Sequence, residues 1–259
     1  MTGGAITALL VAGRRPGVDP LAAHFGVEDK ALIPVAGEPM LSRVARTLVD
    51  HPAIGRVLIL AQEPDRLIAS VPWMAQHPAI APCPGGNSVS AAVSNGIAGG
   101  MFPYLLTTAD NVLLEPAMID SFIAGAQGHD IAAAMVERRT LLAHYPDAKR
   151  TWLHFRRGSW SGANLFWLGS PAADRVLQLW RGIEQDRKKG RAIIGAFGPL
   201  LLLGALLRVL TLHQALRIAG RRLGVDATAV ALPQAEACID VDKPSDHVLA
   251  ERILAGGRR

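Results

Sequence analysis

The residues of this chain that could do chemistry begin with a short basic loop. Ala12-Gly13-Arg14-Arg15 follows an unbroken apolar run, Ile6–Val11, and Lys30 comes after a longer loop. Small residues let backbone N–H groups approach phosphate oxygens, and arginine and lysine side chains neutralise phosphate charge. An open α/β sheet binds its ligand where a core strand ends in such a loop. These residues predict a site for a nucleoside triphosphate.

Carboxylates come later in the chain. The predicted strand Tyr104–Thr108 ends in Ala109-Asp110-Asn111, and Asp240 and Asp242 lie near the end of the sequence. A carboxylate at the carboxyl end of a core strand is well placed to hold a divalent metal, although a lone aspartate there is also a common helix cap or turn former. At i and i+2 of an extended segment, Asp240 and Asp242 are expected on the same side and free for a site. We expect Asp246 to cap the last helix instead.

A second loop of small residues, Gly85-Gly86-Asn87-Ser88-Val89-Ser90, leads into a helix. Free N–H groups and the positive end of the helix dipole suit an anion or a ribose there. An ordinary capped helix explains the same residues and, taken alone, is the better explanation.

Two further polar groups could contact a substrate. Lys149-Arg150-Thr151 lies in a polar segment and could form a cationic loop over a phosphate site, while most other basic residues nearby are expected to be solvated. Gly162-Ala163-Asn164 lies in apolar surroundings, where a polar amide must find partners or bind something.

The elements that must position these residues alternate between strands and helices. Strand, helix and strand in that order predict right-handed parallel βαβ units and an open α/β sheet, with one antiparallel pair after residue 150. We expect strands at 6–11, 56–61, 104–108, 130–136, 151–155, 161–168 and 228–232, and helices at 39–48, 65–74 with a break at Pro72, 117–126, 171–185 and 248–254.

Residues 171–224 are expected to form a helical insert within a single domain that spans residues 1–259. The insert includes the leucine-rich stretch Ile193–Leu212, in which Arg208 interrupts the apolar run before it reaches the roughly 18–20 residues of a spanning helix. Two interpretations remain open. The stretch is either a helix pair packed inside the domain or at a homodimer interface, or a basic-flanked hairpin in peripheral contact with a membrane surface.

Composition limits the class of protein. Of 259 residues, half are hydrophobic and 19% are charged, which supports a sizeable core. The net charge of +5 suits phosphorylated ligands or anionic surfaces, but the low aromatic content of 5% argues against nucleic acid. Two distant cysteines, Cys83 and Cys238, and a start without the order of a signal peptide indicate a cytoplasmic protein.

Four fragments together resemble the nucleotidyltransferases of the GT-A fold, especially MobA-like NTP transferases. They occur in the family's order: Leu10-Val11-Ala12-Gly13-Arg14-Arg15, Lys30-Ala31-Leu32-Ile33-Pro34-Val35-Ala36-Gly37-Glu38-Pro39-Met40, Thr108-Ala109-Asp110-Asn111 and Ile239-Asp240-Val241-Asp242-Lys243-Pro244-Ser245-Asp246. The string from Lys30 to Met40 is the most specific. The resemblance implies a three-layer α/β/α, Rossmann-like domain with a mainly parallel, mixed central sheet.

The resemblance also implies roles. Mg²⁺ would bind Asp110 together with Asp242 or Asp240, and Asn111 and Lys149 are further candidates for substrate contact. By analogy with the family, Ala12, Gly13 and Arg14 would wrap the base edge and phosphates, and Arg15 and Lys30 would contact the triphosphate. The second loop would select base and ribose through Gly85, Gly86 and Ser90. The acceptor would be held by Gly162 and Asn164. The chain departs from the family where Arg14 replaces a second glycine and where residues 193–223 are inserted.

The expected activity is Mg²⁺-dependent transfer of a nucleoside monophosphate from an NTP to a phosphorylated acceptor, small or lipid-linked, with release of pyrophosphate. A GT-A glycosyltransferase is the alternative among enzymes, but it would need an Asp-x-Asp motif in mid-chain. The alternative outside enzymes is a nucleotide-binding or membrane-docking protein that uses the leucine-rich insert as its active surface.

Overall fold

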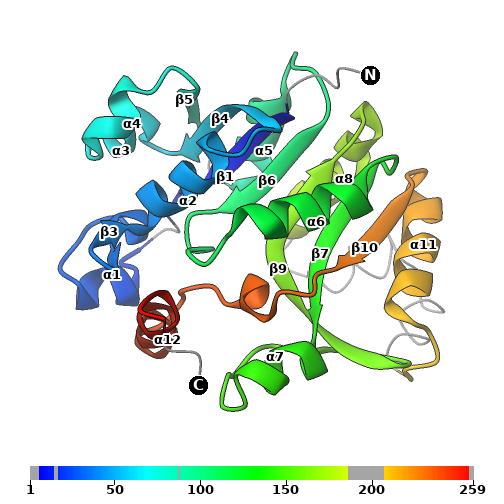
Figure 1. Ribbon diagram of the computed structural model, residues 1–259. Helices are drawn as coiled ribbons and strands as arrows, with labels where there is room; N and C mark the ends of the chain where they lie inside the picture. Colours follow the sequence, from blue (N-terminus) through cyan, green and yellow to red (C-terminus); the bar gives the residue numbers. More distant parts are fainter. Residues whose placement is uncertain (1–5, 15–16, 87, 186–206, 257–259) are drawn as a thin grey trace.

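The computed structural model describes residues 6–14, 17–86, 88–185 and 207–256. Its centre is an eight-stranded mixed sheet in the order β10-β7-β9-β6-β1-β4-β5, with β8 paired to β9 (Figure 1). The strands are β1 (Ile6–Val11), β4 (Ile54–Ala61), β5 (Ile80–Pro84), β6 (Tyr104–Thr108), β7 (Ile131–Glu137), β8 (Leu153–Phe155), β9 (Gly158–Leu168) and β10 (Ala227–Ala231). The two-residue strands β2 (Pro34–Val35) and β3 (Glu38–Pro39) form a separate ribbon.

Parallel pairing joins β5, β4, β1 and β6 on one side of β9, and β7 and β10 on the other. Strand β9 is antiparallel to both β6 and β7. The prediction of a mainly parallel, mixed α/β sheet is therefore confirmed, and the antiparallel pair expected after residue 150 is β8 with β9.

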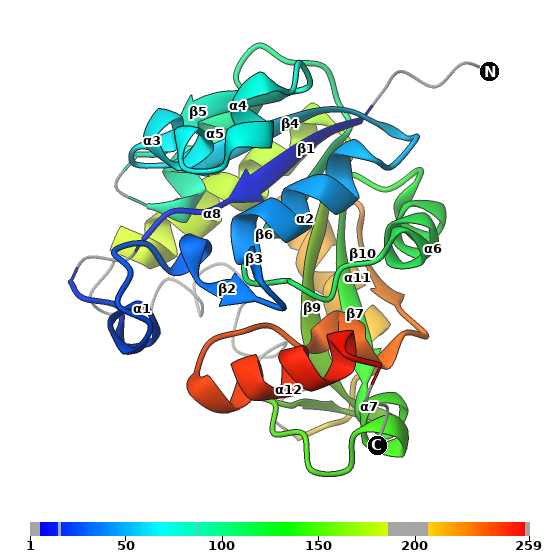
Figure 2. The same cartoon turned by 60° about the vertical axis from the view of Figure 1, so that its left-hand side comes forward.

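Helices cover both faces of the sheet, which explains why β1 is apolar at successive positions rather than at alternate ones. Ala8 and Leu10 pack in the core cluster that includes the α2 and α6 residues Met40, Leu41 and Phe122. Leu9, between them, packs in a second cluster with Val93 of α5 and Leu177 of α8. The result is the three-layer arrangement seen in Figure 2.

The helices in the described ranges are α1 (Pro20–His24), α2 (Met40–Val49), α3 (Pro64–Ala69), α4 (Pro72–Gln76), α5 (Val89–Ile97), α6 (Pro116–Ala126), α7 (Arg138–His144), α8 (Asp174–Gln185), α11 (Leu212–Leu223) and α12 (Pro244–Leu254). The same ranges contain the 3₁₀ turns η1 (Lys30–Leu32), η2 (Pro171–Ala173) and η3 (Ala235–Cys238). The sequence did not predict α7. Asp246 is not the cap of α12, because Lys243 is the N-cap residue and Asp246 lies inside the first turn.

The helical insert expected at 171–224 begins with η2 and α8 and ends with α11. Residues 193–206 of its leucine-rich stretch lie outside the described residues, so both interpretations of that stretch remain predictions. Within the described ranges, no helix is both long enough and apolar enough to cross a membrane.

Candidate functional site

The candidate site forms where parallel strands of the sheet end side by side. Ala12 follows β1, Gln62 follows β4 and Asp110 follows β6, so the parallel pairing of β1 with β4 and β6 brings their loops to one edge. The C-terminal segment joins them, because the N–H of Val241 donates to the carbonyl oxygen of Asp110 at 3.1 Å.

Lys30 is the centre of the site. Its Nζ lies 2.8 Å from Asp110 Oδ2 and 2.5 Å from Asp242 Oδ1, so three residues far apart in the sequence meet at one ammonium group. Burial lowers the pKa of Lys30, but the charges and hydrogen bonds of Asp110 and Asp242 outweigh it, and the net shift is upward. Lys30 is therefore a fixed cation at neutral pH.

The two carboxylates are themselves held in place. Thr108 Oγ1 donates to Asp110 Oδ1 at 2.5 Å, and the N–H of Asp242 donates to Asp246 Oδ2 at 3.3 Å. The side chain of Asp110 is 21% exposed and that of Asp242 is 62% exposed, so both can be reached from solvent. The sequence-based expectation that Asp110 and Asp242 come together agrees with this geometry.

The site offers two carboxylates to a metal ion, those of Asp110 and Asp242, and this number is compatible with Mg²⁺. No group of three or more His, Cys, Asp or Glu residues that could hold a metal is found among the described residues. Mg²⁺ is commonly bound through one or two carboxylates plus substrate phosphates. The oxygens of Asp110 and Asp242 converge on the ammonium group of Lys30, which is the cation that they share in this structure.

Asp240 has other partners. Its Oδ1 lies 2.5 Å from Arg150 Nη1, and its Oδ2 accepts a 2.8 Å hydrogen bond from Asn164 Nδ2. The side chains of Asp240 and Arg150 are each only 14% exposed. Residues 239–243 are not a regular strand, and Asp240 and Asp242 contact different side chains, so the choice of Asp242 or Asp240 as the second metal ligand stays a prediction.

The predicted substrate residues differ in exposure. Asn111 is 1% exposed, and its Nδ2 donates to Thr107 Oγ1 and the carbonyl of Ala163, so it ties β6 to β9 inside the protein. Gly162 is exposed, and a Cβ there would meet no described atom within 4 Å. Asn164 adopts φ +49°, a left-handed conformation that asparagine tolerates better than most residues. Asn111 therefore positions β9, while Gly162 and Asn164 remain candidates for acceptor contact.

The loop after β1 is clamped by a residue that sequence reasoning missed. Gln62 accepts from the N–H of Arg14 at 3.0 Å and donates to its carbonyl at 2.9 Å. A Cβ at Gly13 would approach Gln62 Oε1 to 3.2 Å, so glycine suits this close approach. The N–H of Ala12 continues the sheet by donating to Leu60. The available signal was the position of Gln62, a polar residue at the end of the strand next to β1.

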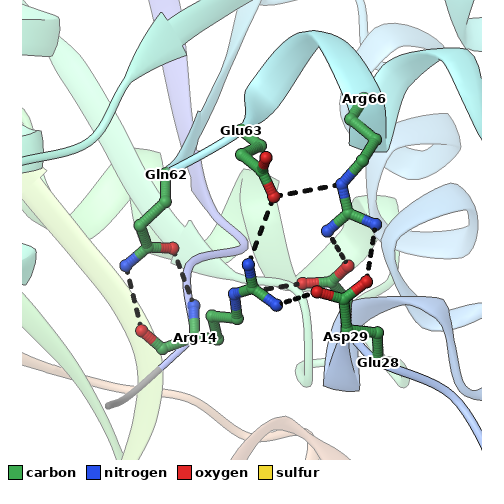
Figure 3. Close-up of polar contacts among 6 residues, drawn as sticks. All are labelled: Arg14, Glu28, Asp29, Gln62, Glu63 and Arg66. Atoms are coloured by element: carbon green, nitrogen blue, oxygen red, sulfur yellow. Dashed lines mark hydrogen bonds and ion pairs between the residues drawn. The ribbon is translucent and has the colours of Figure 1, made fainter.

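The side chain of Arg14 points to carboxylates. Figure 3 shows its guanidinium among Glu28, Asp29 and Glu63, with Arg66 bound to the same three side chains. We call these five residues the arginine cluster. Its hydrogen bond with Glu28 and the nearby negative charges raise the pKa of Arg14. The expectation that Arg14 contacts phosphates is not supported by these contacts. Arg15 lies outside the described residues.

The second loop forms a capped helix start, as the simpler sequence interpretation held. Ser88 caps α5 by accepting from the N–H of Ala91, and Gly86 is needed because a Cβ there would lie 2.8 Å from that of Ala91. Ser90 donates through its N–H and its hydroxyl to Glu184 of α8. A carboxylate of the protein itself therefore occupies the first turn of α5, where an anion was expected. Gly85 contacts Ala61 through its own N–H.

Comparison with known proteins decides the family. A profile described as the MobA-like NTP transferase domain matches residues 10–197, which is more than half of the chain. The chain belongs to this family. Membership in the MobA-like family supports nucleotidyl transfer as the general class of reaction and NTPs as its ligands.

Solved structures agree with the MobA-like assignment. A hypothetical transferase from Thermus thermophilus aligns with 26% identity and a TM-score of 0.77, over 94% of this chain and 99% of its own. A 4-diphosphocytidyl-2C-methyl-D-erythritol synthase from Anaerococcus prevotii has 8% identity and a TM-score of 0.59, over 97% and 98%. A CMP:2-keto-3-deoxy-manno-octonic acid synthetase complexed with CTP has 12% identity and a TM-score of 0.60, over 97% of this chain and 99% of its own. The last two show the fold alone. No curated protein matches in sequence.

Proposed function

We propose that the protein transfers a nucleoside monophosphate from an NTP to a phosphorylated acceptor, with Mg²⁺ bound by Asp110 and Asp242 and with release of pyrophosphate. The observation that carries this proposal is Lys30, held at 2.8 and 2.5 Å from the two carboxylates at the strand ends of a MobA-like domain. Lys30, Asp110 and Asp242 together supply charges of both signs at the edge of the sheet.

The reaction requires no nucleophile from the protein. An oxygen of the acceptor phosphate attacks the α-phosphorus, a new P–O bond forms, and the bond from the α-phosphorus to the bridging oxygen breaks. Pyrophosphate leaves with the electron pair of that bond. Catalysis then consists of positioning and charge stabilisation, as in phosphoryl transfer generally.

The residues of the chain supply most of that stabilisation. Lys30 holds Asp110 and Asp242 together and provides a permanent positive charge for the leaving pyrophosphate, a role we also propose for Arg15. When bound, Mg²⁺ would neutralise phosphate oxygens beside these carboxylates. Gln62 holds the backbone of Arg14 by two hydrogen bonds, which orders the loop after β1 where we propose that the nucleotide binds.

CTP is the nucleotide to test first. Two structural neighbours are cytidyl-transferring enzymes by their descriptions, and one of them was solved with CTP. Isothermal titration of the four NTPs with Mg²⁺, followed by a pyrophosphate-release screen over phosphorylated acceptors, tests the proposal. We expect saturable binding of one NTP and release of pyrophosphate only when acceptor is present.

Asp110→Asn and the control Asp65→Asn sharpen this experiment. Asp65 is an exposed aspartate in the first turn of α3 and has no role in the site. Asp110→Asn should abolish Mg²⁺-dependent release while Asp65→Asn retains it. Near-normal release in Asp110→Asn would refute the metal assignment, and NTP binding without release for any acceptor would favour a binding protein over an enzyme.

A further inference from the structure

A cavity of about 310 Å³ lies between the segment that follows α7 and the helix α12, which are neighbours in both Figure 1 and Figure 2. Its lining includes Tyr145, Ala148, Lys149, Lys243, Leu249 and Arg252. This volume is at the lower end of the range of about 300–1,000 Å³ that is typical of small-molecule sites. Neither Gly162 nor Asn164 contributes to it, so it is distinct from the acceptor residues implied by the family.

The inner part of the cavity is largely apolar. Tyr145 is 5% exposed, and Leu249 and Ala148 are partly buried against the main core. The hydroxyl of Tyr145 donates to Glu236 Oε1 at 2.6 Å, so the polar end of this side chain is already engaged. A ligand would meet aliphatic and aromatic surface in this part of the cavity.

The rim is cationic. Lys149, Lys243 and Arg252 are exposed, and neither Lys149 nor Arg252 makes an ion pair with another described residue. Two carboxylates are also present, those of Asp147 and Asp246. Asp246 is 8% exposed, accepts the N–H of Asp242 and lies 3.9 Å from Lys243 Nζ, so it faces the protein rather than a ligand. The charge that a ligand meets at the rim is therefore positive.

The helix α12 adds to this positive potential. It has eleven residues and begins at Pro244, beside the cavity residues Lys243 and Ser245. Lys243 is its N-cap and makes no side-chain capping hydrogen bond within the described structure. The positive end of the helix dipole therefore lies beside the cavity, together with the carboxylate of Asp246 in the first turn.

The cavity also adjoins the transfer site. Asp246, one of its lining residues, accepts the N–H of Asp242, and the carboxylate of Asp242 contacts Lys30. A molecule in the cavity would therefore be separated from the transfer site by Asp246, whose carboxylate contacts the backbone of Asp242.

We propose that this cavity binds the acceptor, and that the acceptor is a small, soluble phosphate monoester with an apolar body. The body rests on Tyr145 and Leu249, and the phosphate is attracted by Lys149, Lys243 and Arg252 and directed towards Asp242. This assignment rests on the proposed nucleotidyl transfer and specifies the substrate class of the same site.

Phenyl phosphate serves as the probe, because it combines a phosphate with an apolar ring. Binding is measured by isothermal titration to the full-length protein. The double variant Lys149→Ser/Arg252→Ser should weaken binding by roughly tenfold or more, since both rim cations are removed. Arg56→Ser/Arg217→Ser is the matched control, because it removes two exposed arginines outside the cavity and should leave binding unchanged.

A third variant tests the cavity itself. Leu249→Trp fills the apolar part without a change of charge and should also weaken phenyl phosphate, provided that thermal melting shows an intact fold. Equal affinity in all variants, no saturable binding to the wild type, or inorganic phosphate binding as tightly as phenyl phosphate would overturn the proposal.

Two further arms separate related explanations. CTP with Mg²⁺ should bind equally well to the wild type and to Lys149→Ser/Arg252→Ser. If the wild type binds no nucleotide, the proposed function is refuted, and the measured binding of phenyl phosphate to the cavity still stands. Sedimentation with phosphatidic acid vesicles tests for a lipid-borne phosphate monoester. Vesicle binding that the rim variant abolishes would overturn the assignment to a soluble acceptor.

Discussion

Two charged clusters, the Lys30 centre and the arginine cluster, differ in kind. The Lys30 centre joins one ammonium group to two carboxylates, and the arginine cluster joins two guanidinium groups to three. Each has one carboxylate more than it has cations. An ammonium group is a compact point charge, whereas a guanidinium group is a planar fork that matches carboxylate geometry. From this difference we expect Lys30 to interact with ligand charge more readily than the guanidinium groups of the arginine cluster do.

The cations of the two clusters differ in burial. The Lys30 side chain is 20% exposed and that of Asp110 is 21% exposed, whereas that of Asp242 is 62% exposed. Most of the arginine cluster is more open, with Arg14 at 35%, Glu63 at 53% and Glu28 at 62%. Exposed ion pairs contribute little to stability on their own. We propose that the arginine cluster orients a loop and that the Lys30 centre provides charge for the reaction.

The largest expected effect separates the two clusters by activity. Lys30→Met should lower kcat by about 10²–10³-fold, the usual loss when one group that stabilises developing charge is removed. Arg66→Met, a matched removal of a cation from the arginine cluster, should leave kcat close to that of the wild type. The measurement is pyrophosphate release at saturating NTP and acceptor. Equal losses in both variants would remove the functional distinction between the clusters.

Asp240→Asn tests stability rather than charge transfer. The amide keeps the shape of the side chain but leaves the largely buried Arg150 without its counter-ion. We expect the free energy of unfolding to fall by about 2 kcal/mol, less than for a fully buried pair because the amide oxygen can still accept a hydrogen bond. Asp226→Asn is the control, since that aspartate is exposed and pairs with His129. Urea unfolding of both variants measures this difference in stability, and equal unfolding midpoints would contradict the expected loss in Asp240→Asn.

The pH dependence of stability should distinguish Lys30 from exposed lysines. Because folding raises the pKa of Lys30 above its ordinary value of 10.5, its stabilising contribution is complete below that pH and is lost as pH rises through the folded-state value. The wild type should therefore lose stability more steeply than Lys30→Met above about pH 10.5. Chemical unfolding over this range gives the slopes. Lys149→Met, at an exposed lysine, should keep the wild-type slope.

The smallest effect is expected in the arginine cluster. Arg66→Met should lower the melting temperature slightly at low salt, since the carboxylates around it lose one of their two cations. The difference from the wild type should shrink at high salt, because the screening length falls to about 3 Å at 1 M. Thermal melts at two salt concentrations provide the measurement. A large loss that does not depend on salt would show that the cluster supports the core.

Sequence reasoning succeeded where local pattern and sheet topology determine the outcome. The strand predicted at 104–108 coincides with β6, and the helix at 171–185 with η2 and α8. Parallel strands end at the same edge, so a lysine and an aspartate after such strands could be expected to meet. The seven residues of α7 were missed because only Leu141 among them is buried, which leaves no apolar periodicity to detect.

The partners of polar side chains were not predictable in the same way. Arg14 resembles a phosphate ligand in sequence, but Glu28 and Glu63 reach it from two other segments. Ser90 looks like part of an anion site, and Glu184 reaches it from a helix ninety-four positions further on. Nothing local to either residue encodes these contacts, because long-range packing of α3 and α8 determines them.

The contact between Lys30 and Asp242 spans 212 positions in the sequence. During synthesis Lys30 emerges early, and its second carboxylate emerges only after every strand of the central sheet has been made. A nascent chain can therefore assemble the sheet and the loop after β1 while Lys30 still lacks half of its anionic environment. The order of translation itself delays catalytic competence until the last segment docks against the finished sheet.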